Sequence, residues 1–242
     1  MKKTLNLKLG SSDALIVADV QKDFLPGGAL PVKEGDLIVP VLNEYIRIFQ
    51  NAKAKIIASR DWHPSNHLSF KAQGGPWPPH CVQETEGAKF SPDLKLPEDT
   101  TIVSKATDPN KEAYSVFDDT GLSNLLKVQG ISRVFIGGVA TDYCIVNSAL
   151  DAGKLGLGVV VLMDGVRGIN VNPGDVDKAI DAMLKSGAEQ VTLADFPETE
   201  TLAGEISSAE VVGDKPLNKV AVKKKARMRS KGSYKRIRRE RG

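Results

Sequence analysis

The chain has 242 residues, of which 41% are hydrophobic and 26% are charged, and this composition is typical of a globular protein that buries a core. No apolar run approaches the roughly 18 residues that a membrane-spanning helix needs, and no apolar stretch of signal-peptide length precedes the first predicted strand, so we expect a cytoplasmic protein without a membrane segment. The two cysteines, Cys81 and Cys144, are too few for a disulfide scaffold and leave each thiol free for a role of its own.

Six short apolar segments rich in Val and Ile alternate with segments of helical periodicity. They cover residues 14–19, 55–59, 101–104, 134–138, 159–163 and 191–193, and such runs are typical of buried parallel strands. Residues 36–52 carry apolar side chains at helical spacing, and residues 173–186 begin with Pro-Gly-Asp and end before Gly187. Both segments are therefore predicted to be helices that connect strands.

This alternation predicts an α/β fold with a doubly wound, mostly parallel six-stranded sheet and helices on both faces. The length suits one such domain, which we place at residues 1–204. In sheets of this kind ligands bind outside the carboxyl ends of the strands. The residues that directly follow strands are therefore the first candidates for a functional site.

Three side chains of complementary chemistry follow three different strands. Asp19 ends the first strand, Lys105 ends the third, and Cys144 follows the fourth at the start of a helix predicted to run to Gly153. Taken singly, each has an ordinary explanation: Asp19 could belong to a turn, Lys105 could reach solvent, and Cys144 could be a buried packing residue. Their convergence favours function, because a helix N-terminus and an ammonium both favour a nucleophilic thiolate.

The segment of residues 60–99 lacks the periodic pattern and contains all three histidines of the chain. Asp61 and His63 are two residues apart in extended backbone and point the same way, while His80 adds another imidazole. His67 either reaches the same point or supports it from outside. Such donors suit zinc, iron or manganese, and the alternative is a set of solvated loop histidines.

The last 22 residues are strongly basic. Residues 221–242 contain eleven Lys or Arg and one Glu, and since the whole chain carries +3 and this segment +10, residues 1–220 carry a net charge of −7. A like-charge run with few apolar residues cannot offset its ordering entropy by burial, so residues 205–242 are predicted to form a flexible tail. The tail either contacts nucleic acid or another polyanion or serves only solubility.

Several motifs together resemble the nicotinamidases, or pyrazinamidases, of the isochorismatase-like cysteine hydrolase superfamily, and the similarity extends over residues 12–196. The pattern of Asp, Lys and Cys resembles that of the superfamily in general. The Asp-Trp-His and Trp-Pro-Pro-His-Cys segments narrow the resemblance to the nicotinamidase branch. The segments that carry it are DVQKDF from Asp19, DWHP from Asp61, WPPHC from Trp77, Lys105 with YSVF from Tyr114, and GVATDYC up to Cys144.

The resemblance implies a catalytic triad and a metal centre. The triad would be Asp19, Lys105 and Cys144. A divalent metal, usually zinc or iron, would be bound by Asp61, His63 and His80, and His67 stays open as a further ligand because members of the family differ there.

The resemblance also implies how the substrate is held. Phe24, Trp77 and Tyr114 would line the pocket for the ring. A cis peptide would join Val139 to Ala140, beside an oxyanion hole formed by the backbone N–H groups of Ala140 and Cys144.

The function implied is hydrolysis of nicotinamide to nicotinate and ammonia in NAD salvage, through a cysteine thioester, with the metal positioning the pyridine ring. Another amidase of the superfamily that acts on a different small amide is the nearest alternative. A non-catalytic protein that binds polyanions through its tail is a second alternative, and the complete triad argues against it. The sequence leaves open whether the chain forms homo-oligomers.

Overall fold

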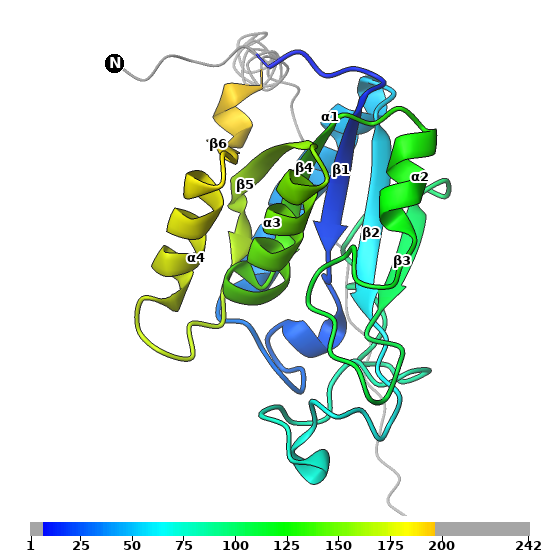
Figure 1. Cartoon of the computed structure of the whole chain (residues 1–242), viewed down its shortest axis with the longest axis vertical. Coiled ribbons are helices and arrows are strands. Elements are labelled where there is room, and N and C mark those ends of the chain that lie inside the picture. Colours follow the sequence, from blue (N-terminus) through cyan, green and yellow to red (C-terminus); the bar gives the residue numbers. More distant parts are fainter. Residues whose placement is uncertain (1–6, 197–242) are drawn as a thin grey trace, which may run out of the picture.

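The computed structural model of the chain describes residues 7–196, which form three layers in which helices cover both faces of one sheet (Figure 1). The predicted domain end at residue 204 and the predicted flexible tail of residues 205–242 lie outside the described residues and stay predictions. Within residues 7–196, no helix has the length and apolar composition that crossing a membrane requires.

The sheet of the described residues has six parallel strands in the order β3-β2-β1-β4-β5-β6, which confirms the predicted α/β fold. Its strands are β1 (Asp13–Ala18), β2 (Lys55–Asp61), β3 (Thr101–Lys105), β4 (Arg133–Val139), β5 (Gly158–Arg167) and β6 (Glu189–Val191). The connection after β1 leads to β2 on one side, and the chain later crosses back to place β4 on the other side. The point where the order reverses therefore lies between β1 and β4.

The strand ends lie within two residues of the predicted ones, except that β5 extends further, and β6 is shifted as a whole toward the N-terminus. The sequence predicts the last strand at residues 191–193, but the Asp195 carboxylate accepts hydrogen bonds from the Thr192 N–H at 2.8 Å and from its hydroxyl at 3.1 Å. This capping pulls Leu193–Asp195 into a 3-10 turn, so β6 ends at Val191. β5 runs beyond the predicted end at residue 163, because after a register shift between Ile136 and Gly138 it pairs again with the end of β4.

The helices lie as a doubly wound sheet requires. They are α1 (Ile38–Asn51), α2 (Leu122–Val128), α3 (Val146–Lys154) and α4 (Asp175–Lys185). The predicted helices at residues 36–52 and 173–186 are confirmed as α1 and α4, with ends trimmed by two residues or less, and residues 35–37 form a 3-10 turn. Figure 1 shows α1 behind the sheet and α2, α3 and α4 in front of it.

Each face of the sheet has its own hydrophobic core, because side chains alternate along each strand. Leu15 and Val17 of β1 point toward α1, where Phe49 packs edge-on against Phe135 with ring centroids 5.0 Å apart. The alternate residue Ile16 belongs to the core under α2 and α3. Both cores are fully buried around β1, so the central strands are held rigidly from two sides.

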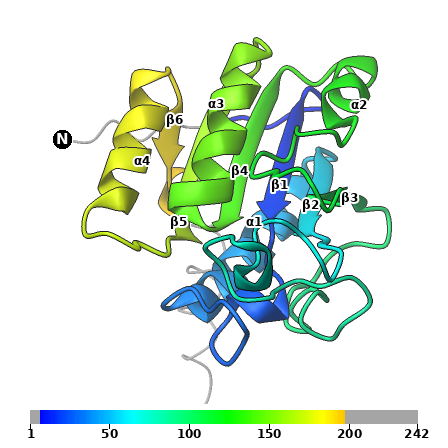
Figure 2. The same cartoon turned by 60° about the horizontal axis from the view of Figure 1, so that its bottom comes forward.

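Irregular segments gather at the carboxyl edge of the sheet (Figure 2). The longest, residues 62–100, contains a single 3-10 turn, Lys71–Gln73, as its helical structure. It is joined to the segment after β1 by an antiparallel bridge between Gln21 and Phe90. This edge is where the candidate residues of the sequence analysis meet.

Candidate active site

Four neighbouring strands deliver one reactive side chain each to the same edge of the sheet. Asp19 directly follows β1, Asp61 and Lys105 are the last residues of β2 and β3, and Cys144 lies in the turn after β4. Asp61 and Lys105 stand opposite each other in the register of β2 and β3. Asp19 and Cys144 follow the two strands that flank the point where strand order reverses. The topology therefore brings the three predicted triad residues together.

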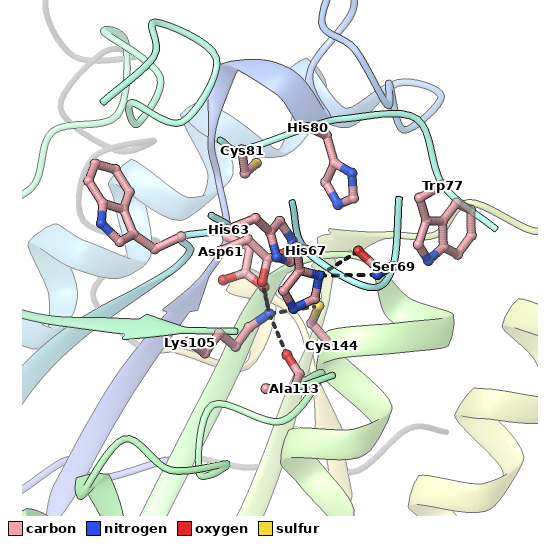
Figure 3. A network of polar contacts seen from close by, with 12 residues as sticks. Asp61, His63, His67, Ser69, Trp77, His80, Cys81, Lys105, Ala113 and Cys144 are labelled. Carbon is pink, nitrogen blue, oxygen red and sulfur yellow. Dashed lines mark hydrogen bonds and ion pairs between the residues drawn. The ribbon is translucent and has the colours of Figure 1, made fainter. Parts of the chain in front are cut away.

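The Lys105 ammonium is the centre of this cluster (Figure 3). Its Nζ lies 3.0 Å from an Asp19 carboxylate oxygen, in closer contact with Asp61, 3.3 Å from the Cys144 sulfur and 3.4 Å from the Ala113 carbonyl oxygen. The side chains of Asp19 and Lys105 are completely buried, and Cys144 is 5% exposed. A buried cation of this kind persists only when acids surround it, which they do here.

The two carboxylates around Lys105 have different electrostatic environments. Burial raises the pKa of Asp19 above its ordinary value, and the Lys105 ammonium offsets this only in part. At Asp61 burial is the largest single influence and acts to raise the pKa, but Lys105, His63 and His80 together outweigh it and hold the pKa below the usual range. Two acids whose pKa values are pushed apart take different roles, so Asp61 stays ionised while Asp19 is suited to exchange protons.

The Lys105 charge itself is secure. Burial opposes it, but the Asp19 and Asp61 carboxylates outweigh burial and raise the pKa of the ammonium well above its ordinary value. Ser59 adds a hydrogen bond of 2.7 Å from its hydroxyl to the second Asp19 oxygen, and its side chain is fully buried. Lys105 thus stays charged beside two carboxylates, of which Asp61 stays ionised and Asp19 can gain or lose a proton.

The environment of Cys144 differs from the sequence expectation in one respect. The helix after β4 begins with a π-helical turn, Thr141–Ile145, and Cys144 lies within that turn ahead of α3. Burial raises the pKa of its thiol well above the ordinary value, and the nearby Lys105 lowers it only in part. The ammonium favours the thiolate, as expected, but against this burial the thiol needs a base to take its proton.

A second cluster next to the first has the composition of a metal site. Asp61, His63 and His80 each offer a ligand atom, these atoms lie within 4.8 Å of one another, and all three residues are buried. Neither ring nitrogen of His63 has a hydrogen-bond partner, and its Nε2 is 3.6 Å from an Asp61 oxygen, too far for a hydrogen bond. Because buried polar atoms without partners are costly, the donor set fits a divalent cation.

His80 is prepared in the way that metal-binding histidines usually are. Its Nδ1 lies 2.8 Å from the Pro78 carbonyl oxygen, which fixes the ring and leaves Nε2 as the free nitrogen. Burial lowers the pKa of His80, which favours the neutral form that can donate a lone pair. A third group of donors, Asp19, Asp61 and Cys144, also lies within 4.8 Å, but Lys105 contacts all three. That position belongs to the ammonium.

His67 lies beside the metal cluster but outside its donor set. Its ring is 4.3 Å from the His63 ring, centroid to centroid, and is fully buried. Both of its nitrogens are engaged. Nδ1 lies 2.8 Å from the Ser69 hydroxyl (Figure 3), and Nε2 lies 3.0 Å from the Lys111 carbonyl oxygen. The geometry therefore favours the supporting role for His67 over the role of ligand.

Three aromatic side chains form a wall beside the cluster. The Trp77 indole N–H donates to the Tyr114 hydroxyl at 3.2 Å, and the Tyr143 ring packs against both, with centroids 5.2 and 5.5 Å away. Phe24, the other predicted pocket residue, lies against His80 at 5.4 Å. Tyr143 is not among the pocket residues predicted from the sequence, although its position next to Cys144 could have identified it.

Other polar residues in the recognised segments serve the backbone. Asp142 accepts hydrogen bonds from Ile169 and Asn170 N–H groups at 2.9 and 2.6 Å, and Asp23 accepts one from the Cys81 N–H at 2.7 Å. Cys81 is fully buried. These side chains hold turns and fill the core. The peptide between Val139 and Ala140 is cis, as the resemblance implies.

A known protein family matches most of this chain. Residues 13–195 match the isochorismatase domain, and that match covers well over half of the chain. The chain belongs to the isochorismatase family. This isochorismatase-family chain is 40% identical to the nicotinamidase of Escherichia coli (strain K12) over an alignment of 208 residues. The alignment covers 77% of this chain and 98% of the relative.

Solved structures extend the similarity to the fold. The pyrazinamidase of Pyrococcus horikoshii in complex with zinc is 54% identical, and its structure aligns with a TM-score of 0.72. The alignment covers 75% of this chain and 99% of the pyrazinamidase chain. PnC1 from L. infantum in complex with nicotinate has a TM-score of 0.71 at 34% identity and covers 78% of this chain and 98% of the other. The resemblance predicted from the sequence motifs is confirmed.

The charge arrangement around Lys105 predicts a large effect on stability in this isochorismatase-family chain. Lys105→Met keeps most of the volume but leaves the Asp19 and Asp61 carboxylates buried without their cation, so we expect the free energy of unfolding to fall by about 3–5 kcal/mol in urea denaturation at neutral pH. The control is Lys154→Met, which breaks the exposed pair with Asp151 and should leave stability unchanged. Equal stability of Lys105→Met and the wild type would contradict the prediction.

Proposed function

We propose that the chain is a nicotinamidase that hydrolyses nicotinamide to nicotinate and ammonia. The observation that carries the proposal is the buried contact of Lys105 with Asp19 and Cys144, directly beside the donor set of Asp61, His63 and His80. The similarity to the Escherichia coli nicotinamidase over 98% of its length supports the same activity. A thiol, a base and a metal site in one place suit the opening of a small aromatic carboxamide.

In the first half of the reaction, Asp19 takes the proton of the Cys144 thiol and the sulfur attacks the amide carbonyl carbon. The base is needed because burial holds the thiol pKa high. The Lys105 ammonium, 3.3 Å from the sulfur, stabilises the thiolate as it forms. The new carbon–sulfur bond turns the carbonyl oxygen into an oxyanion.

The oxyanion is stabilised by the backbone N–H groups of Ala140 and Cys144, and losing one donor of this kind typically costs about 10²- to 10³-fold in rate. When the tetrahedral intermediate collapses, the carbon–nitrogen bond breaks and Asp19 returns its proton to the leaving ammonia. A thioester on Cys144 remains. In the second half Asp19 activates water, which cleaves the thioester and releases nicotinate with the thiol restored.

The metal, when bound by Asp61, His63 and His80, would supply a Lewis-acid contact for the pyridine nitrogen of the substrate. We propose zinc, with iron or manganese as alternatives that the same nitrogen and oxygen donors suit. Phe24, Trp77 and Tyr114 would hold the ring, with Tyr143 completing the wall. The metal centre thus serves chiefly to position the ring rather than to make a nucleophile.

Another isochorismatase-family amidase activity is the nearest alternative. A panel of small carboxamides, assayed with and without a chelator, distinguishes the two, because a chelator-insensitive preference for a non-aromatic amide would favour the alternative. The expected cytoplasmic location and any homo-oligomer stay predictions.

The covalent scheme is tested with a cysteine pair. Cys144→Ala removes the nucleophile but not the ring site, so ammonia release from nicotinamide should fall to background while nicotinate binding, followed by calorimetry, stays close to the wild type. The control Cys81→Ala removes the other buried thiol and should keep its turnover. Substantial turnover by Cys144→Ala would refute the thioester mechanism.

The metal site is tested with a histidine pair. His63→Ala removes a nitrogen donor without other partners, so the purified protein should lose its metal, measured by elemental analysis, and its KM for nicotinamide should rise. His67→Ala should keep its metal, because both His67 nitrogens are bound elsewhere. A variant His67→Ala that loses metal as fully as His63→Ala would show that His67 is a ligand.

A second proposal concerns residues 205–242. The family match ends at residue 195, and 98% of the Escherichia coli relative is covered by 77% of this chain, so the basic segment lies beyond what the activity requires. Eleven cations within residues 221–242 would release counterions on binding phosphates. We propose that this segment binds nucleic acid without sequence preference, as an addition to the amidase.

A truncated chain ending at residue 204 tests the tail. It should hydrolyse nicotinamide as the full chain does, whereas only the full chain should bind a labelled single-stranded RNA of 30 nucleotides. The logarithm of the binding constant should fall linearly with the logarithm of salt, with a slope of about −0.7 for each phosphate neutralised. Equal RNA binding by the truncated and full chains would reject this role.

A further inference from the structure

Gln21 holds Asp61 in place where the regular sheet ends. The last register pair of β1 and β2 is Ala18 with Ser59, and the Asp19 N–H then donates to the Ser59 carbonyl oxygen at 3.1 Å. Asp19 has a positive φ of 55°, so the chain turns away from β2 at this residue. β2 nevertheless continues to Asp61 (Figure 1). The edge of β2 that faced β1 would therefore be left without a backbone partner at Asp61.

The Gln21 side chain takes the place of the missing strand. Its Oε1 accepts a hydrogen bond from the Asp61 N–H at 2.8 Å, and its Nε2 donates to the Asp61 carbonyl oxygen, also at 2.8 Å. One primary amide thus supplies both the acceptor and the donor that a strand backbone would supply. The side chain is fully buried, so water cannot replace either bond.

The same amide also fixes the loop that faces the site. The second N–H of Gln21 donates to the Ala88 carbonyl oxygen at 2.9 Å, which satisfies both donors of the amide. Backbone bonds on either side, from Lys22 N–H to the Lys89 carbonyl and from Asp23 N–H to the Gly87 carbonyl, attach the same two segments. Gln21 therefore joins the end of β1, the end of β2 and residues 87–90 at one point.

Asp61 is the residue at which the two parts of the site meet. One of its oxygens contacts the Lys105 ammonium, and its other oxygen lies 3.6 Å from His63 Nε2. A shift of the Asp61 backbone would therefore disturb Lys105 and the donor set together. We infer that Gln21 is a positioning residue that sets the Asp61 carboxylate between the proposed metal centre and the proposed triad.

This inference rests on the proposed function, and its test uses the full-length protein. Gln21→Met keeps the length of the side chain and removes all three hydrogen bonds. In metal-free protein, competition with a chromophoric chelator measures the affinity for Zn²⁺, which should fall by about 10- to 100-fold, as is usual when a partner of a ligand is lost. At saturating Zn²⁺ the kcat for nicotinamide should stay below wild type, because Lys105 is also displaced.

The matched control is Gln83→Met. Gln83 also donates its side-chain amide to a backbone carbonyl, that of Trp62 at 2.9 Å, one residue away from Asp61. Its loss should leave the Zn²⁺ affinity and kcat near wild type. A merely structural role for Gln21 would lower thermal stability in both variants without separating their Zn²⁺ affinities, and that result would overturn the inference.

If Gln21→Met does not fold, Gln21→Glu decides, since it keeps the acceptor for the Asp61 N–H and loses the donors to the two carbonyl oxygens. Its Zn²⁺ affinity should fall well below that of Gln83→Met, and an unchanged affinity would overturn the inference. A wild-type protein that binds no Zn²⁺ would overturn the metal proposal and this inference together. A wild type that binds Zn²⁺, with Gln21 variants that bind it equally well, would overturn only the positioning role.

Discussion

The site depends on one buried ammonium that two carboxylates and a thiol share. Lys105 comes from an edge strand, yet its side chain is enclosed completely and contacts residues from β2 and from the segments after β1 and β4. A buried charge of this kind is costly unless its partners are fixed in place. The rigid centre of the sheet, packed on both faces, supplies that fixity.

The ammonium also separates the roles of two otherwise similar acids. Asp61 lies between Lys105 and His63, where it stays ionised and can serve a metal ion. Asp19 shares the ammonium but is dominated by burial, so its pKa is raised and it can both take and return a proton. The chemistry of proton transfer and the chemistry of ligand placement are thereby divided between neighbours that touch the same cation.

Much of the fold and of the site could be predicted from the sequence. The features that could not be predicted depend on contacts between residues distant in the sequence. The strands, the reactive residues that follow them and the types of metal donor can be read from local sequence patterns. That these residues meet could be predicted because the carboxyl ends of parallel strands share one edge of the sheet. His67 is kept out of the metal donor set by Ser69 and by the Lys111 carbonyl, which is distant in the sequence. The hydrogen bonds by which Gln21 holds Asp61 likewise include one to the distant Ala88. The high thiol pKa of Cys144 reflects its burial by residues distant in the sequence, which no local pattern encodes.

The distribution of the site along the chain bears on its synthesis. Its groups span residues 19 to 144. Asp19, Asp61, Lys105 and Cys144 lie at or just after the ends of four different strands, and β1 lies between its partners β2 and β4. A nascent chain that has not yet completed β4 therefore holds Asp19, Asp61 and Lys105 but lacks Cys144, the proposed nucleophile. The site is complete only when β4 pairs with β1, a strand made more than a hundred residues earlier. Incomplete chains should therefore have no amidase activity.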